Sequence, residues 1–379
     1  MEHSVQLSDH MAQITMTTTE EESVITRTHE RAPFSNQGTH AALIFTVLAI
    51  TAVTAHTLVA QQAVTHELPL SADNIHWGFY DASLEPVVTI RSGDRVYFEN
   101  LLARGLDRLR LAGISEDRFL PSMLNVEEQE TVRVGSHPLN GPVYVEGAEV
   151  GDVLEVRLID IGFLADYGVS GFLPGGGTLP MDFPSAALRA FEIDTINGTI
   201  TMTGVEGIEI PARPFFGSIG VAPPVLRGRI NSTAPGYHVG NLDNKDLVEG
   251  TTLFMPVHVD GALLSIGDGH AAQGDGEVTG TAIEASLYGT IEVILHKDRT
   301  LQWPRAETPT HYISMGLDPD LDEAARMATR EMVKFLVEDK GMESGDAYIL
   351  CSVALNLRIT QLVDGTKGVH GMLSKDLFR

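Results

Sequence analysis

The sequence predicts a β-rich α+β fold, a sandwich or barrel with a C-terminal helix–strand unit. Three observations lead to this prediction: short runs alternate apolar and polar residues, glycine and proline separate those runs, and one helical pattern stands near the C-terminus. The 379 residues include 37 Gly and 18 Pro, which supply turns between short strands. A hydrophobic share of 43% is enough for a large core.

The chain is strongly acidic, with 51 acidic and 26 basic side chains and a formal net charge of −25. This charge repels phosphate backbones, so we exclude nucleic acid as a partner. The single cysteine, Cys351, excludes an internal disulfide and any cluster of cysteine ligands, and it favours a reducing compartment. We therefore expect a cytoplasmic location.

The first sixty residues differ in composition from the rest. Residues 1–40 have no hydrophobic period and are predicted to be a disordered extension. Residues 41–60 are apolar and have about the ~20 residues of a spanning helix, although threonines and a histidine dilute them. Two interpretations stay open, a membrane anchor or a buried helix, and the protein is membrane-anchored if the segment spans. Residues 61–379 are the expected functional domain.

Within that domain the elements follow in order. Residues 86–90, 95–99, 141–145 and 153–158 are predicted strands, because they alternate and have turn residues beside them. Residues 168–181 are rich in Gly and Pro, which predicts either a lid over a substrate or a flexible surface loop. Asp318-Pro-Asp-Leu-Asp begins a helix, with acidic residues in its first turn. Residues 348–353 are predicted to be a buried strand.

Three clusters that contain glycine concentrate acids, amides and histidine. In the first, residues 137–152, Glu146 follows a predicted strand beside a turn, where its carboxylate faces either a pocket or the backbone N–H groups of the turn. In the second, Asn241, Asp243 and Lys245 are spaced by two, so an extended chain places them on one face. A metal ligand with a neighbouring amide and a cation fits this second pattern, and so does a solvated loop with Asx turns.

The third cluster is residues 265–277, SIGDGHAAQGDGE. Asp268 and His270 are two apart, and so are Asp275 and Glu277, while four glycines allow the backbone to approach a ligand closely. Hard oxygen donors beside one imidazole are accepted by Zn²⁺ or by a harder divalent ion. The ligand order of an EF-hand is absent, and so are the HExxH, GxSxG, GxGxxG and P-loop motifs. Activation of water by a metal is therefore the hydrolytic chemistry that fits best.

At these clusters the sequence resembles the acetamidase/formamidase family. The stretches that carry the resemblance are HWGFYDASLEPVVTIRSGD, GPVYVEGAEVGDVLEV, PFFGSIGVAPP, GNLDNKDLVEGTTLFMPVHVDGALLSIGDGHAAQGDGEVTGTAIE and LVDGTKGVHGML. They follow the order of the family and cover residues 66–379. The sequence departs from the family at Val239, where a glycine is usual, and at Leu242, where a methionine is usual.

The resemblance implies an enzyme, an amidase that hydrolyses a small linear amide such as acetamide or formamide and releases ammonia. It also implies a homo-oligomer and a metal cofactor, with Zn²⁺ preferred. The role assignments that follow are a hypothesis. Asp243, Asp268 and His270 hold the divalent ion that activates water. Glu146 moves the proton and Lys245 stabilises the oxyanion. The substrate is bound by His76, Trp77, Asn241 and Gln273.

Two other functions stay open. Related members of the family open small lactams, so a cyclic amide is an alternative substrate. A β-sandwich that binds a ligand through acidic Ca²⁺ loops without catalysis is the alternative from another class, and the sequons at Asn197 and Asn231 fit a secreted protein of that kind.

Overall fold

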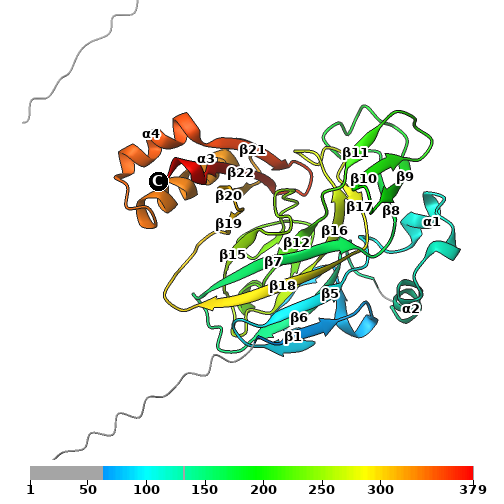
Figure 1. Ribbon diagram of the computed structural model, residues 1–379, viewed down its shortest axis with the longest axis horizontal. Coiled ribbons are helices and arrows are strands. Elements are labelled where there is room, and N and C mark those ends of the chain that lie inside the picture. The colour runs from blue at the N-terminus through cyan, green and yellow to red at the C-terminus, as the bar shows by residue number, and fades with distance from the viewer. Residues whose placement is uncertain (1–62, 131–132, 379) are drawn as a thin grey trace, which may run out of the picture. The chain divides into compact units, whose positions relative to one another are not determined.

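Two large β-sheets form the framework of the protein in the computed structural model (Figure 1). The structure describes residues 63–130 and 133–378, which belong to the compact unit Ala60–Arg379. The disordered extension predicted for 1–40 and the anchor or buried helix predicted for 41–60 lie outside the described residues. Among the residues that are described, no helix has the length and apolar character needed to cross a membrane.

The first sheet has nine strands, in the spatial order β1 (Thr65–Leu68), β5 (Arg95–Glu99), β18 (Leu287–His296), β7 (Val153–Phe163), β15 (Thr252–Pro256), β19 (Arg305–Glu307), β20 (His311–Asp318), β22 (Lys367–Ser374) and β21 (Asn356–Gln361). Neighbouring strands are antiparallel except β1 and β5. Both ends of the order are free edges, so this sheet is open and not a barrel.

The second sheet has eleven strands. Its main path is β11 (Glu209–Pro211), β10 (Thr199–Met202), β9 (Ala187–Asp194), β8 (Tyr167–Phe172), β17 (Ile283–Glu284), β16 (Leu264–Ala272), β12 (Phe215–Gly220) and β14 (Val239–Asn241). A branch on β16 adds β6 (Pro138–Val145), β2 (Ile75–Trp77) and β4 (Val88–Ile90). A separate ribbon pairs β3 (Phe79–Tyr80) with β13 (Ile230–Asn231).

The main core lies between the two sheets, which makes the fold a sandwich. Phe98 of β5 and Phe216 of β12 meet there with their ring centroids 4.8 Å apart. A second apolar cluster packs β2 and β8 against the helices α1 (Asp107–Leu111) and α2 (Pro121–Gln129). The β-rich fold class and the sandwich are thus confirmed, whereas the barrel alternative is not what forms.

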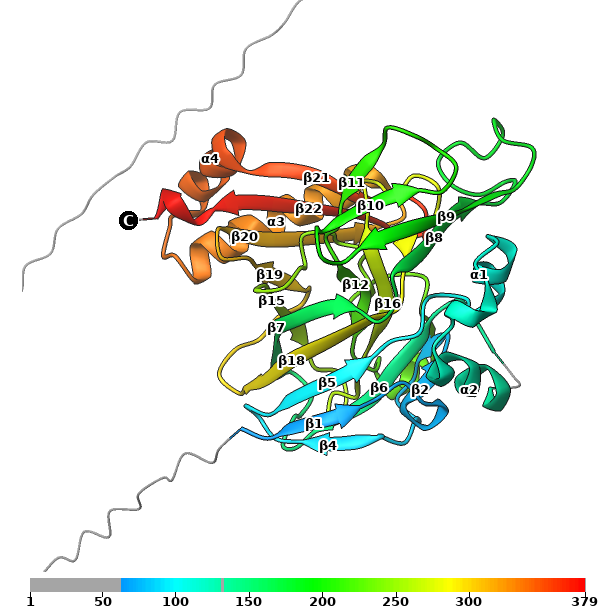
Figure 2. The same ribbon diagram turned by 45° about the vertical axis from the view of Figure 1, so that its right-hand side comes forward.

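The C-terminal unit packs two helices, α3 (Leu321–Glu338) and α4 (Ser344–Ala354), on strands β20, β22 and β21 (Figure 2). The predicted helix is confirmed: the Asp320 side chain caps α3 by accepting hydrogen bonds from the backbone N–H groups of Asp322 and Glu323. Close packing on β20 depends on Gly316, where a Cβ would collide with the backbone of Ala324.

The buried strand predicted at 348–353 is wrong, because these residues belong to α4. Ala347 and Cys351, four positions apart, are buried, whereas Tyr348, Ile349 and Val353 are exposed. A short apolar run has no period that separates a buried strand from a helix, and here the helix forms. The four strands predicted by residue range all form. Residues 95–99 are β5, residues 141–145 and 153–158 lie within β6 and β7, and the last three residues of 86–90 form β4. Short 3₁₀ turns occur at η1 (Ala72–Asn74), η2 (Glu116–Arg118), η3 (Val225–Arg227) and η4 (Lys375–Leu377).

Candidate active site

The candidate site is built around the middle of β16, a strand with neighbours on both sides in the second sheet. Asp268 and His270 are two positions apart on it, so their side chains share one face. His270 Nε2 lies 3.4 Å from Asp268 Oδ2, and both side chains are almost fully buried. Charged groups buried away from solvent need partners, and these come from other segments of the chain.

Four further carboxylates converge on this pair. Glu284 of β17 stands opposite His270 in the strand register, and its Oε2 lies 3.5 Å from His270 Nε2. Asp243, just after β14, places Oδ1 4.0 Å from His270 Nδ1. Glu277 and Asp364 complete the set, and three overlapping groups of these side chains offer ligand atoms within 4.8 Å of one another. We call these six residues the acid–histidine cluster.

The backbone around the cluster is unusual. Asp243, Asp268 and Glu277 all have positive φ, at 48°, 60° and 44°, a conformation that non-glycine residues rarely adopt. On the neighbouring strand β12, a Cβ added to Gly217 would lie 2.7 Å from Asp268 Oδ2 and would collide with Asp243 Oδ1. The strained backbone and this glycine together keep a small space open between the carboxylates.

Two amide side chains orient the cluster. Gln273 Nε2 donates to the backbone carbonyl of Asp243 at 2.7 Å, which leaves its Oε1 to accept a hydrogen bond from His270 Nδ1 at 3.1 Å. Nε2 of His270 is then the nitrogen that faces Asp268 and Glu284. Asn241 Nδ2 donates to Asp243 at 2.6 Å and to Asp364 at 3.3 Å.

Burial and the repulsion between neighbouring carboxylates determine which groups of the cluster are protonated. Burial raises the pKa of Asp243 well above its usual value, and the nearby carboxylates of Glu277 and Asp364 raise it further. The same two causes, burial and the charge of Asp364, raise the pKa of Glu277. Burial alone would lower the pKa of His270, but Asp268 and Glu284 outweigh it and raise the pKa. The cluster therefore favours positive charge at its centre, whether a proton or a metal ion carries it.

The residues present fit a divalent ion. Asp243 Oδ1, Asp268 Oδ1 and Glu284 Oε2 are buried without a hydrogen-bond partner among the described residues. An orphaned buried carboxylate oxygen is costly unless a cation or a proton satisfies it. Carboxylate oxygens with one imidazole nitrogen are ligands that Zn²⁺ and related ions accept.

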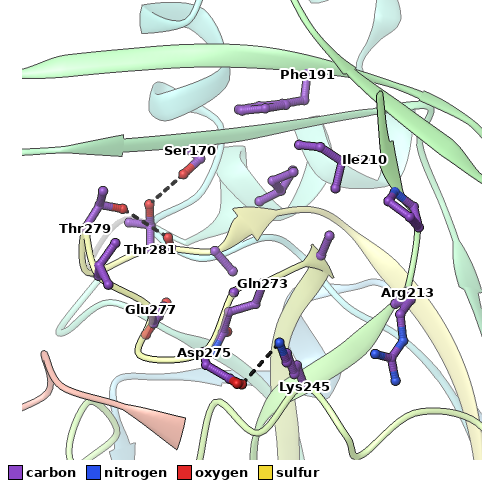
Figure 3. A pocket seen from close by; sticks show the side chains of 16 residues that line it. Ser170, Phe191, Ile210, Arg213, Lys245, Gln273, Asp275, Glu277, Thr279 and Thr281 are labelled. Carbon is purple, nitrogen blue, oxygen red and sulfur yellow. Dashed lines mark hydrogen bonds and ion pairs between the residues drawn. The ribbon is translucent and has the colours of Figure 1, made fainter. Parts of the chain in front are cut away.

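A cavity of about 40 Å³ lies at the cluster, bordered by Asp243, Asp268 and Glu277 among others. It adjoins a pocket of about 540 Å³: Arg104, Arg108 and four further residues border both. We call this the outer pocket. A third pocket, of about 450 Å³, lies beside Gln273 and Glu277 (Figure 3).

The structure brings together five of the nine residues that the sequence predicted for the site: Asn241, Asp243, Asp268, His270 and Gln273. Asn241 and Asp243 lie side by side as expected, since the two side chains are hydrogen-bonded, although Asp243 is beyond the end of β14. The other four predicted residues lie elsewhere.

Glu146 is not part of the cluster. It is exposed in the turn after β6 and pairs with Arg91 at 3.2 Å. His137, just before the same strand, does reach the cluster, with Nε2 3.9 Å from Asp268 Oδ2. The two residues are nine positions apart, which is roughly 30 Å of extended chain, so only one end of β6 can reach the site.

Lys245 also lies apart from the cluster. Its ammonium pairs with Asp275 at 3.1 Å, and both side chains border the third pocket (Figure 3). The alternation that placed Lys245 beside Asp243 fails because β14 ends at Asn241 and Asp243 has positive φ.

His76 and Trp77, predicted to bind substrate, border neither the small cavity nor the outer pocket. His76 Nε2 lies 2.9 Å from Ser265 Oγ, and burial lowers the pKa of His76 to about 4. Trp77 belongs to the core cluster that packs α1 and α2, with the Arg133 guanidinium 5.6 Å from its ring centroid.

The prediction missed several residues of the site. Glu284 and Asp364 come from stretches without any local cluster of acids, and only their place in the family-like segments TGTAIE and LVDGTKG marked them. Glu277 and His137 stood inside two of the three clusters but received no role. Arg108, from α1, pairs with Glu284 at 3.7 Å and had no signal in the sequence.

Fold and site together define a β-sandwich protein with a buried acid–histidine site beneath a pocket. The chain belongs to the acetamidase/formamidase family, whose model matches residues 125–234 and 227–378. Over 249 residues it is 30% identical to a formamidase of Methylophilus methylotrophus, a match that covers 50% of this chain and 61% of that protein. The curated relatives are matched over 61%, 49% and 47% of their own lengths.

Solved structures extend the likeness to most of the chain. An acetamidase of Bacillus halodurans is 33% identical, with a TM-score of 0.69 over 82% of this chain and 98% of that one. A γ-lactamase of Delftia acidovorans is 24% identical, with a TM-score of 0.53 over 83% of this chain and 93% of that one, which shows a shared fold alone.

Proposed function

We propose that the protein is an amidase that hydrolyses the carbon–nitrogen bond of a small linear amide and releases ammonia and a carboxylate. The observation that carries the proposal is the acid–histidine cluster, with three buried carboxylate oxygens that lack a hydrogen-bond partner among the described residues. The relatives named formamidase and acetamidase support the choice of substrate class.

A divalent ion, with Zn²⁺ preferred, is the cofactor of this proposal. Asp243, Asp268 and His270 would hold it, and Glu284 Oε2 offers a further ligand atom. When bound, such an ion supplies Lewis acidity and lowers the pKa of a neighbouring water to about 7. Gln273 fixes the His270 ring so that Nε2 faces Asp268 and Glu284, and Gly217 keeps the centre of the cluster free.

Glu277 replaces Glu146 as the group that moves protons. It borders the small cavity, belongs to two of the three ligand groups, and has a raised pKa through burial and neighbouring carboxylates. A carboxyl with a raised pKa holds a proton more readily than an exposed one, so it can act as an acid as well as a base. In the proposal Glu277 accepts the proton of the attacking water and gives it to the leaving nitrogen.

Arg108 replaces Lys245 as the cation near the carbonyl oxygen. Its side chain is 11% exposed and borders both the small cavity and the outer pocket. A guanidinium fixed by its ion pair to Glu284 is able to donate to an oxygen that gains negative charge during attack.

Two alternative functions remain. A lactam is a substrate of the same chemistry, because ring opening breaks the same type of bond. A non-catalytic Ca²⁺ site fits less well, because Ca²⁺ selects oxygen ligands and His270 stands at the centre of the cluster.

The homo-oligomeric state and the cytoplasmic location also remain proposals. Light scattering of the purified protein tests the oligomeric state.

The test is ammonia release from formamide and acetamide, and ring opening of a γ-lactam, with one preparation stripped by a chelator and the same preparation reloaded with Zn²⁺. We expect ammonia release only after reloading. Ring opening without ammonia release would favour the lactam. Metal uptake without turnover of any of the three would reject the hydrolytic proposal.

A further inference from the structure

The outer pocket is much larger than a two-carbon amide requires. Its volume is about 540 Å³, whereas one water molecule takes about 30 Å³ and acetamide has only four non-hydrogen atoms. The pocket adjoins the small cavity at the acid–histidine cluster, and six residues border both: Arg104, Arg108, Thr233, Gly280, Thr281 and Asp364. A substrate bound there has room beyond its reacting amide.

The walls of the outer pocket indicate the character of that additional part. Phe172, Leu173 and Leu188 of the β8–β9 hairpin supply apolar surface, and α1 lies beside the same strands (Figure 2). Arg104 and Arg108 are the only two cations that border it among residues 63–130 and 133–378. An aliphatic middle and an anionic end would match this distribution.

The two arginines differ in what they contact. Arg108 pairs with Glu284 at 3.7 Å, so its charge belongs to the cluster. Arg104 is exposed to the pocket and forms no ion pair or side-chain hydrogen bond within the described part of the chain. In a protein with about twice as many acids as bases, an arginine that borders the pocket without an acidic partner is available to a ligand.

The backbone holds Arg104 in a strained conformation. Its φ is +64°, in the left-handed region that glycine adopts without cost, and its N–H donates to the carbonyl of Ser136 at 2.7 Å. Strain of this kind persists where the surrounding structure fixes it, and it is concentrated at ligand sites. The neighbouring Gly105 also has positive φ, so the turn presents the Arg104 side chain from a defined position.

We propose that Arg104 binds a free carboxylate at the far end of the substrate, so that the preferred substrates are monoamides of short dicarboxylic acids. This rests on the proposed amidase function of the same site. Hydrolysis of such a substrate adds one water, breaks the carbon–nitrogen bond, and yields ammonia and the dicarboxylate. The guanidinium and carboxylate form a charge-assisted pair, and bidentate geometry makes it specific for arginine. Arg104 is thus a specificity-determining residue.

The experiment compares succinamate with 4-methylpentanamide, in which an isopropyl group replaces the carboxylate. We expect the Zn²⁺-loaded protein to show a higher kcat/KM for succinamate. Arg104→Gln should lower kcat/KM for succinamate about tenfold or more and change it less than about twofold for the neutral amide. Arg104→Lys should have a kcat/KM for succinamate between those of the unchanged protein and Arg104→Gln, because lysine keeps the positive charge but loses the two parallel N–H donors of the guanidinium. Arg326→Gln, which removes an exposed arginine of α3, is the matched control and should change neither.

A second measurement separates this inference from the amidase proposal. Succinate binding to the Zn²⁺-loaded protein is measured by calorimetry, which needs no turnover. Binding that weakens about tenfold in Arg104→Gln supports the carboxylate site even if no amide is hydrolysed. The carboxylate site would be overturned by an equal loss of kcat/KM on both amides in Arg104→Gln, or by the absence of a preference for succinamate. Succinate binding that is absent, or that is unchanged in the variant, would also overturn it. Hydrolysis of the neutral amide alone would leave the amidase proposal intact.

Discussion

Glu284 stands opposite His270 in the register of β17 and β16, and its Oε2 lies 3.5 Å from His270 Nε2. A carboxylate and an imidazole at this distance, both almost free of solvent, form a pair whose charge the protein itself must balance. Four more carboxylates surround the pair, so the balance needs an additional positive charge. The predictions about the site follow from this requirement.

Replacing His270 by Ala removes the single nitrogen ligand and the positive partner of Asp268 and Glu284. We expect the variant to bind Zn²⁺ more than about 100-fold more weakly and to lose ammonia release. Metal content after dialysis against a limiting Zn²⁺ buffer measures the first effect. His311→Ala, which removes a histidine of β20 that is hydrogen-bonded to Thr310, is the control and should retain its metal. Full metal content and full turnover in His270→Ala would remove the metal scheme.

Replacing Gly217 by Ala tests the space at the centre of the cluster. The added methyl group would lie 2.7 Å from Asp268 Oδ2 and 2.9 Å from His270 Cε1, and would collide with Asp243 Oδ1. Gly217 does not have a positive φ, so the effect is due to contact and not to backbone strain. We expect a loss of Zn²⁺ affinity of about tenfold or more while the protein still folds, measured by calorimetry and by circular dichroism.

The matched control for Gly217→Ala is Gly345→Ala on α4. No atom lies within 4 Å of a Cβ built at Gly345, which is exposed. Alanine is the better helix former, so this variant should gain about 0.4–1 kcal/mol in the free energy of unfolding and keep its Zn²⁺ affinity. Equal Zn²⁺ affinities in the two variants would show that the space beside Gly217 is not the metal site.

The sequence was sufficient to predict the central strand of the site. Asp268 and His270 are two apart among glycines, and a period of two places them on one face whatever sheet they join. The same reasoning placed Asn241 and Asp243 together, and they are hydrogen-bonded, although Asp243 lies beyond the end of β14. It was wrong for Lys245, because local periodicity holds only as long as the chain remains extended, and β14 ends at Asn241.

The rest of the site depends on pairing between distant strands. Glu284 reaches His270 through the register of β16 and β17, and Asp364 reaches Asn241 from 123 residues away. No local pattern carries such information. Glu146 was correctly predicted to follow the end of a strand. The pairing of β6 with β16 decides which end of β6 faces the cluster, and Glu146 is at the other end. Similarly, α4 could not be told from a strand because its apolar run is short.

Glu331 on α3 gives a pH-dependent prediction outside the site. Burial raises the pKa of Glu331 above its ordinary 4.5, although Lys334 and Arg305 partly offset it. A carboxyl whose pKa is higher in the folded state than in the unfolded state lowers stability as the pH rises above the unfolded value. Glu331→Gln should therefore raise Tm more at pH 8 than at pH 4, where the protonated carboxyl and the amide are nearly equivalent.

The control for this prediction is Glu338→Gln on the same helix, where the side chain is exposed. The Tm of both variants is measured at pH 4 and pH 8 after a chelator has removed any bound metal. A change in Tm that is the same at both pH values for Glu331→Gln would show that the effect comes from packing and not from the ionised carboxyl.

Glu277→Gln distinguishes the two carboxylates that have been considered for proton transfer. Glu277 borders the small cavity and is buried, whereas Glu146 is exposed and paired with Arg91. If Glu277 moves the proton, its replacement by Gln should lower kcat by roughly 10²–10⁴-fold while Zn²⁺ content is retained. Glu146→Gln should leave kcat within about twofold. Rates of ammonia release, with metal content measured on the same samples, decide the matter: a large loss in Glu146→Gln with none in Glu277→Gln would reverse the assignment, and loss of metal from Glu277→Gln would make Glu277 a ligand.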